Sequence, residues 1–135
     1  RYGNFNTALG RSGSNPLGGE EKDFFMRMRS QGIRYYFVPG AAIRHITPAS
    51  KLSEEYFERL TRMIGVSERI RTLGEGKSAF RRRLLAEAVK WGGTLALATG
   101  YALRGQAIKG RYLIRMRRNI TQGLLRGMPP AERDA

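Results

Sequence analysis

The stretch Gly18-Gly19-Glu20-Glu21-Lys22-Asp23-Phe24-Phe25-Met26-Arg27 places three carboxylates within four residues, after a glycine pair and before an apolar run. The cluster is unusual because the chain has 11 acidic residues against 25 basic ones. Apolar residues follow at helical spacing, which predicts a helix over 20–31 that ends at Gly32. Two interpretations are open: the carboxylates favour the positive end of the helix dipole, or one of them is presented as a general base.

The segments around this helix predict a mixture of loops, strands and a second helix. Residues 1–19 are rich in Gly, Asn and Ser and predict a loop anchored by Phe5 and Leu9. Residues 33–38 are dense in β-branched and aromatic types, which predicts a strand, and 41–46 predict a second short strand after Pro39-Gly40. From Ser53, a potential cap, apolar residues recur at helical steps. Glycines at 65, 74 and 76 then predict a boundary, with a junction near 72–78.

Several residues of the first half form an ordered series. The series comprises Phe5, Leu9-Gly10, Gly13, Gly18-Gly19-Glu20-Glu21-x-Asp23-Phe24-Phe25-x-Arg27-x-Arg29-x-x-Gly32, Tyr36-x-Val38-Pro39 and His45. It resembles the C-terminal half of the catalytic domain in family 2 glycosyltransferases. That family has a GGED-x-D-L-x-x-R-x-x-x-G helix, then a Y-x-V-P strand, then a histidine six residues after the proline. The resemblance covers residues 1–71 firmly and the rest of the chain only loosely.

This resemblance implies both a fold and an activity. The implied fold is that of nucleotide-diphospho-sugar transferases, so the expected fold class is an α/β fragment over 1–74. An α-helical, amphipathic, basic region is expected to follow over 75–135. The implied activity is metal-dependent transfer of a sugar from a nucleotide-diphospho-sugar to a glycan or lipid-linked acceptor, as in polysaccharide biosynthesis.

The resemblance also implies which carboxylate acts as the base. Glu21 stands where the family most often has the aspartate that takes the proton of the acceptor hydroxyl, although glutamate is longer by one methylene group. Glu20 is the second candidate for this catalytic role. Asp23 is expected to orient the acceptor or to cap the turn. A carboxylate suits this role because a sugar hydroxyl is a weak nucleophile until a base accepts its proton.

Two residues near the second predicted strand complete the implied site. His45, the only histidine of the chain, is implied to bind a divalent metal (Mg²⁺ or Mn²⁺) on the donor diphosphate, or to lie beside that metal. The alternative is a polar residue at the end of an edge strand. Arg44 is a candidate for contact with a donor phosphate. The other metal ligands should belong to an Asp-x-Asp motif, which this chain lacks. We therefore expect a preceding nucleotide-binding half, and we expect the chain alone to be inactive.

Charge separates the two halves of the chain. The net charge is +14, and residues 77–126 carry 12 basic residues and one acidic residue, Glu87. Such asymmetry points to an anionic partner, either a membrane surface or nucleic acid. The alternative function is therefore a basic module that binds nucleic acid or a membrane surface without catalysis. Nucleic acid is the less favoured partner, because the front half carries no recognition motif. The absence of cysteine excludes disulfides and cysteine metal sites.

The back half predicts a helix that lies on a membrane rather than one that crosses it. The uncharged run Trp91–Leu103 covers about 20 Å as a helix, which is short of the roughly 30 Å of a bilayer core. A stripe of apolar residues then recurs every four positions among arginines: Ile108, Tyr112, Met116, Ile120 and Leu124. This pattern predicts an interfacial helix at the cytoplasmic face of the cell membrane, bound to anionic lipid. The alternative is a basic helix packed on the rest of the protein, with its charges in water.

Overall fold

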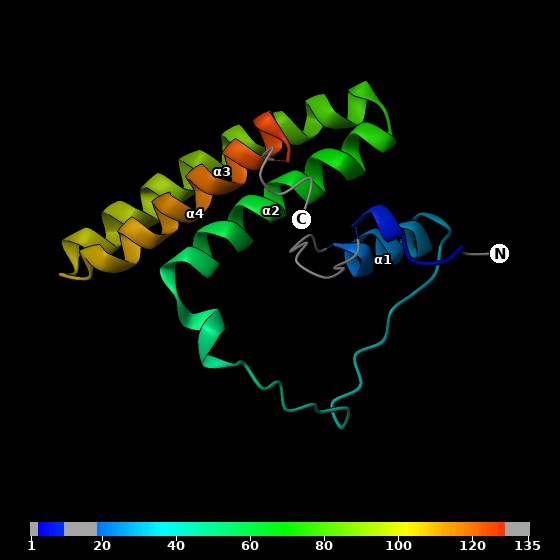
Figure 1. Ribbon diagram of the computed structural model, residues 1–135, viewed down its shortest axis with the longest axis horizontal. Helices are drawn as coiled ribbons and strands as arrows, with labels where there is room; N and C mark the ends of the chain where they lie inside the picture. Colours follow the sequence, from blue (N-terminus) through cyan, green and yellow to red (C-terminus); the bar gives the residue numbers. More distant parts are fainter. Residues whose placement is uncertain (1–2, 10–18, 129–135) are drawn as a thin grey trace.

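A computed structural model describes residues 3–9 and 19–128 of this protein. All regular elements within these residues are helices. Two short 3₁₀-helices, η1 (Thr7–Leu9) and η2 (Ala49–Leu52), accompany four α-helices. These are α1 (Glu20–Ser30), α2 (Glu54–Gly74), α3 (Lys77–Leu103) and α4 (Ala107–Arg126). Helices α2, α3 and α4 pack together, and α1 lies beside the C-terminal part of α2 (Figure 1).

The expected α/β fold class is wrong, because the described residues contain no strand. The segment 33–48, predicted to hold two strands, has no regular secondary structure apart from a turn at 39–40. It is exposed from residue 34 onward, with Phe37 at 89% and Ile43 at 92% exposure. It leaves α1, swings away from the helices and returns to η2 (Figure 1). A strand needs a neighbour that pairs with its backbone groups, and no described segment provides one. Residue preference alone therefore leaves this segment unpaired.

Helix α2 begins as predicted but continues further than expected. The hydroxyl of Ser53 accepts a hydrogen bond from the backbone N–H of Tyr56 at 3.1 Å, and Glu54 and Glu55 occupy the first turn. The helix then runs through Gly65 to Gly74. Gly65, which was expected to mark a boundary between segments, instead lies inside α2 at the point where this helix crosses α4. Without a side chain there, the two backbones can come into contact.

The crossing of α2 and α4 is built on a pair of glycines. A Cβ atom on Gly65 would overlap the carbonyl oxygen of Ile120 and lie 2.8 Å from the backbone nitrogen of Leu124. In the opposite direction, a Cβ atom on Gly123 would overlap the carbonyl oxygen of Arg62. Each helix thus fits its backbone against the backbone of the other.

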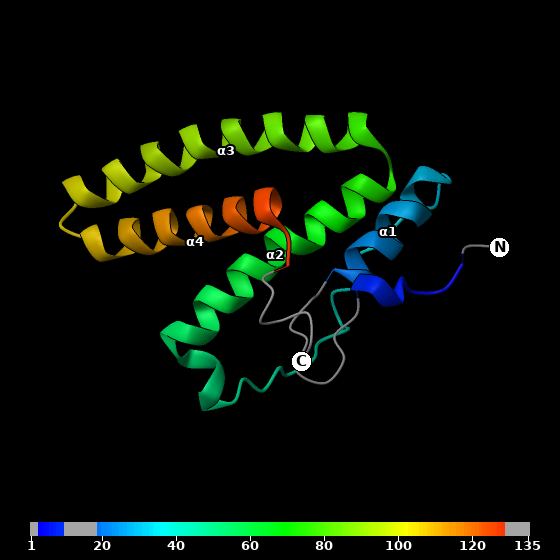
Figure 2. The same cartoon turned by 45° about the horizontal axis from the view of Figure 1, so that its top comes forward.

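Helices α3 and α4 form a hairpin. Helix α3 passes without interruption through Gly92-Gly93 and Gly100. The chain turns at 104–106, where Gly105 has a positive φ of 72°, and α4 returns antiparallel beside α3 (Figure 2). Small residues face each other here too, since a Cβ atom on Gly110 would lie 3.0 Å from the carbonyl oxygen of Ala98.

The C-terminal part of the apolar stripe of α4 packs against the protein. Ile120 and Leu124 are buried at the crossing with α2, and the ring of Tyr112 meets that of Phe57 edge-on at 5.5 Å. Ile108, at the start of the stripe, remains 58% exposed. This part of the stripe is therefore used in packing, as the alternative interpretation expected, while Arg117 of the same helix is not in water but paired with the buried Glu87. The apolar core is small, with these fully or nearly buried members: Leu9, Met63, Val66, Ala79, Ala98, Ile120 and Leu124.

Candidate functional site

The acidic motif lies in the first turn of α1, and two of its three carboxylates hold that turn together. The helix starts after Gly19, whose φ of 129° suits glycine alone among the common residues. The Glu20 carboxylate accepts a hydrogen bond from the backbone N–H of Gly19 at 2.9 Å. The Asp23 carboxylate accepts one from Nε of Arg27, also at 2.9 Å, and forms an ion pair one turn along the helix. The Asp23 side chain thus links the first turn of α1 to the next one, and its expected role toward the acceptor stays a prediction.

Glu21 is the free carboxylate of the motif. Its side chain is exposed, and it has no hydrogen-bond or ion-pair partner among residues 3–9 and 19–128. Because Glu20 and Asp23 fix the turn on either side, the backbone position of Glu21 is well defined while its carboxylate stays available. A free carboxylate in this position can accept a proton from a hydroxyl group that comes within hydrogen-bond distance.

The structure does not bring the predicted phosphate and metal residues to this motif. Arg44 and His45 lie in the exposed 33–48 segment, and no described hydrogen bond or ion pair joins either of them to Glu20, Glu21 or Asp23. Nor does the described part of the chain gather three His, Cys, Asp or Glu side chains into a group that could hold a metal ion. The described residues do not, by themselves, fit the metal site that the resemblance implies. The assignments of His45 and Arg44 stay predictions.

An ion pair connects the acidic motif to the helical bundle. Lys22, between Glu21 and Asp23, places its ammonium group 2.6 Å from a carboxylate oxygen of Glu68 on α2. On the other side of α1, Phe24 stacks on Phe5 with ring centroids 4.8 Å apart. The motif is thus held from two sides. No local pattern points to Glu68, because it is 46 residues away from Lys22 in the sequence.

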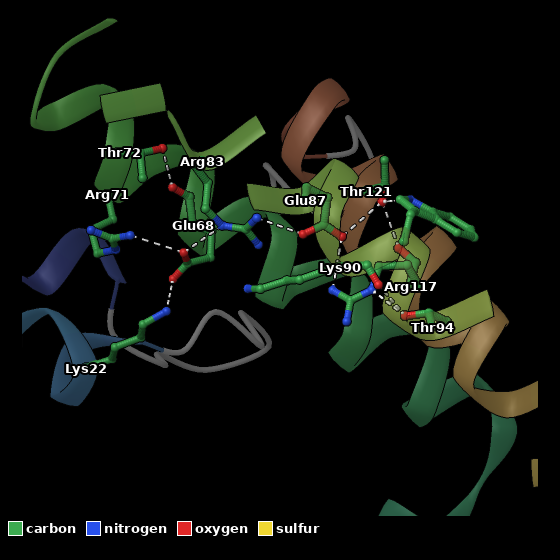
Figure 3. A network of polar contacts seen from close by, with 11 residues as sticks. Lys22, Glu68, Arg71, Thr72, Arg83, Glu87, Lys90, Thr94, Arg117 and Thr121 are labelled. Atoms are coloured by element: carbon green, nitrogen blue, oxygen red, sulfur yellow. Dashed lines mark hydrogen bonds and ion pairs between the residues drawn. The ribbon is translucent and has the colours of Figure 1, made fainter. Parts of the chain in front are cut away.

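Glu68 and Glu87 centre a buried polar network that joins all four α-helices (Figure 3). Glu68, only 8% exposed, accepts hydrogen bonds from Lys22 and from two arginines, Arg71 at 3.1 Å and Arg83 at 3.0 Å. Arg83 bridges to Glu87, 3% exposed, with an N–O distance of 2.7 Å. Further contacts to Glu87 come from the α4 residues Arg117, at 3.1 Å, and Thr121, at 3.2 Å. One sequence signal points here: Glu87 is the single acidic residue among 12 cations in 77–126.

Both buried carboxylates are ionised at neutral pH. Burial raises the pKa of Glu68, but hydrogen bonds from Arg71 and Lys22 and their positive charges outweigh burial and lower the pKa to about 2. Burial likewise raises the pKa of Glu87, and hydrogen bonds from Arg83 and Arg117 more than reverse this, so that its pKa is lowered. Carboxylates of this kind are poor proton donors or acceptors near pH 7. The network therefore holds helices together, and Glu21 is the better candidate for chemistry.

An apolar hollow lies at the other end of α2. It has a volume of about 510 Å³ and is lined by residues from α2, α3 and α4, among them Phe57, Tyr101, Lys109 and Tyr112. Phe57 is eleven residues before Glu68, which is about 16 Å along a helix. Because Lys22 anchors α1 at Glu68, this hollow and the acidic motif are separate features.

Comparison with family models, with curated proteins and with solved structures finds no match for this chain. Function is therefore inferred from the residues and their geometry.

Proposed function

We propose that this chain supplies the acceptor-activating part of a glycosyltransferase. The enzyme would transfer a sugar from a nucleotide-diphospho-sugar to a glycan or lipid-linked acceptor, as in polysaccharide biosynthesis. The observation that carries the proposal is the free, exposed carboxylate of Glu21, on a turn held by Glu20 and Asp23. A second observation supports the proposal: Glu21 occupies the position of the base in the series of residues that resembles family 2 glycosyltransferases.

The proposed reaction uses Glu21 as the general base. Its carboxylate accepts the proton of the acceptor hydroxyl while that oxygen forms a bond to the anomeric carbon. The bond from the anomeric carbon to the diphosphate oxygen breaks, and the nucleoside diphosphate leaves with the electron pair. Glu20 and Asp23 position Glu21 through the backbone of the turn. Mg²⁺ or Mn²⁺, expected from the resemblance, is assigned no step because the described residues do not form a site for it.

We expect Glu21→Gln to abolish most of the turnover while donor binding is retained. The amide has nearly the same shape but cannot accept the proton, and loss of a general base costs about 10²–10⁴-fold in rate. The measurement is transfer of radiolabelled sugar from a panel of nucleotide-sugars, using membranes of cells that make the protein at its natural length. The matched control is Glu55→Gln, an exposed carboxylate in the first turn of α2, which should keep wild-type activity.

Three outcomes would contradict, in turn, the choice of Glu21 as the base, the acidic motif as the site, and the glycosyltransferase activity. If Glu21→Gln stays within about threefold of wild type while Glu20→Gln is inactive, the base is the other glutamate. If both variants are active, the acidic motif is not the site. If the wild-type protein transfers sugar from none of the nucleotide-sugars, the glycosyltransferase proposal itself fails.

A further inference from the structure

Helix α3 is polar on the side that faces the protein and apolar on the side that faces outward. Its buried residues include Glu87, bound to Arg117 of α4, and Thr94, whose hydroxyl accepts a hydrogen bond from Nε of Arg117 at 3.2 Å. Trp91 donates its indole N–H to Thr121 of α4 at 3.0 Å. Helices of water-soluble proteins usually have the reverse arrangement, with the apolar side packed inward.

The outward side of α3 forms a continuous apolar face. Its central line recurs at steps of four and three residues, and all its members are exposed: Leu85, Val89, Gly92, Ala96, Thr99 and Leu103. The large side chains are well exposed, with Leu85 at 70%, Val89 at 77% and Leu103 at 84%. From Leu85 to Leu103, a stretch described in full, Lys90 is the one charged side chain that is exposed. An apolar face of this length is typical of an interaction surface.

Cations stand at both ends of this outer face. Arg81 and Arg82 precede it and Arg104 follows it, and all three are exposed with no ion-pair partner among the described residues. By contrast, Arg83 and Arg117, which point into the bundle, are paired with Glu68 and Glu87. Unpaired positive charge therefore lies at both ends of the apolar face, an arrangement that suits apolar contact within a negatively charged surface.

We propose that the outer face of α3 lies in the interface of a membrane that contains anionic lipid. None of the described helices is both long enough and apolar enough to cross a bilayer. The face extends about 28 Å along the helix, so α3 would lie flat, with its side chains in the acyl boundary and its terminal arginines among the phosphates. The lipid-contacting element is thus α3 and not the stripe of α4, which is used in packing against α2. This inference is independent of the glycosyltransferase proposal.

A bilayer explains the charges better than a second copy of the chain does. A symmetric contact through the α3 faces would run either parallel or antiparallel. A parallel contact places Arg81 and Arg82 against the same residues of the partner copy. An antiparallel contact places them against Arg104. Like charges meet in both cases, whereas lipid phosphates would complement them.

The test uses the 135-residue chain and vesicles of phosphatidylcholine, with or without phosphatidylglycerol. We expect the protein to sediment with the anionic vesicles, less so as salt rises to about 0.5 M. The triple variant Leu85→Gln, Val89→Gln, Leu103→Gln should bind about tenfold more weakly or worse, since it removes apolar area from the interface. The matched control changes equally exposed apolar residues elsewhere: Ile43→Gln, Ile46→Gln and Leu52→Gln. It should bind like wild type, and circular dichroism should show unchanged helix content in both variants.

A position-specific probe keeps the test decisive if the triple variant fails to fold. The chain has no cysteine, so Val89→Cys and Ile43→Cys can each carry a single nitrobenzoxadiazole label. Anionic vesicles should raise and blue-shift the emission at position 89 but not at position 43. Absence of vesicle binding, or an equal response at both positions, would overturn the proposal. So would a dimer in light scattering that the triple variant dissociates, because a second copy would then cover the face.

Discussion

Replacement of Gly65 by alanine is expected to destabilise the protein by about 3 kcal/mol or more, among the largest effects of any single methyl group in this chain. The added Cβ would overlap the carbonyl oxygen of Ile120. Both groups belong to helices, so the clash cannot be relieved by a side-chain rotation, and α2 and α4 must move apart. Chemical denaturation followed by circular dichroism measures the change in the free energy of unfolding.

Gly92→Ala is the matched control for this prediction. Gly92 is also inside a helix, but a Cβ atom there would have no neighbour within 4 Å. Alanine is a better helix former than glycine, so this variant should be more stable by about 0.5–1 kcal/mol. If Gly65→Ala were stabilised in the same way, the close crossing of α2 and α4 would not exist in solution.

Glu68→Gln is expected to destabilise the protein by about 3 kcal/mol at pH 7, the scale seen when one partner of a buried ion pair is removed. Glutamine keeps the shape of the side chain but leaves Lys22, Arg71 and Arg83 without their common anion. Glu75→Gln is the control, because Glu75 also pairs with Arg71 but its side chain is 50% exposed. Exposed pairs contribute little, so this control should lose at most about 1 kcal/mol.

The effect of Glu68→Gln should shrink in acid. The pKa of Glu68 falls from 4.5 to about 2 on folding, so its carboxylate stabilises the protein above pH 4.5 and loses this effect as the pH falls toward 2. At pH 3 the difference between wild type and Glu68→Gln should be about half its value at pH 7. A difference that stays constant from pH 7 to pH 3 would show that the carboxylate charge is not what matters.

Local patterns in the sequence predicted the helices correctly, but the two strands and the α/β fold class that they also indicated are wrong. The start of α1 after Gly19, the cap at Ser53 and the helical nature of the basic region depend on neighbouring residues, and the structure agrees with them. The strands predicted over 33–38 and 41–46 would need a neighbouring strand to pair with, and local residue preferences cannot show whether one is present. Gly65 was expected to loosen the chain because the sequence does not reveal that α4 lies against it.

The candidate site was likewise predicted in part. The sequence located the acidic motif, and the resemblance placed Glu21 before Glu20 as the base. The structure adds that Glu20 and Asp23 have partners for their carboxylates whereas Glu21 has none among the described residues. The network of Glu68 and Glu87 was missed, since its contacts join residues far apart, such as Arg117 and Glu87 at a separation of 30. The spacing of apolar residues among the arginines of 108–124 suggested that the membrane-facing stripe is on α4. In the structure, the exposed apolar face is on α3 instead.

Within residues 19–128, the exposed stretch 33–48 is where a protease should cut first. A protease binds its substrate as an extended strand, and this segment has no regular secondary structure apart from a turn, whereas most other basic residues lie in hydrogen-bonded helices. Trypsin should therefore cleave at Arg34 and Arg44 before it reaches the arginine-rich helices. The long product would retain α2, α3 and α4. The short product would be held by the ion pair of Lys22 with Glu68, which salt weakens, and by η1, which contacts α2 and contains the buried Leu9.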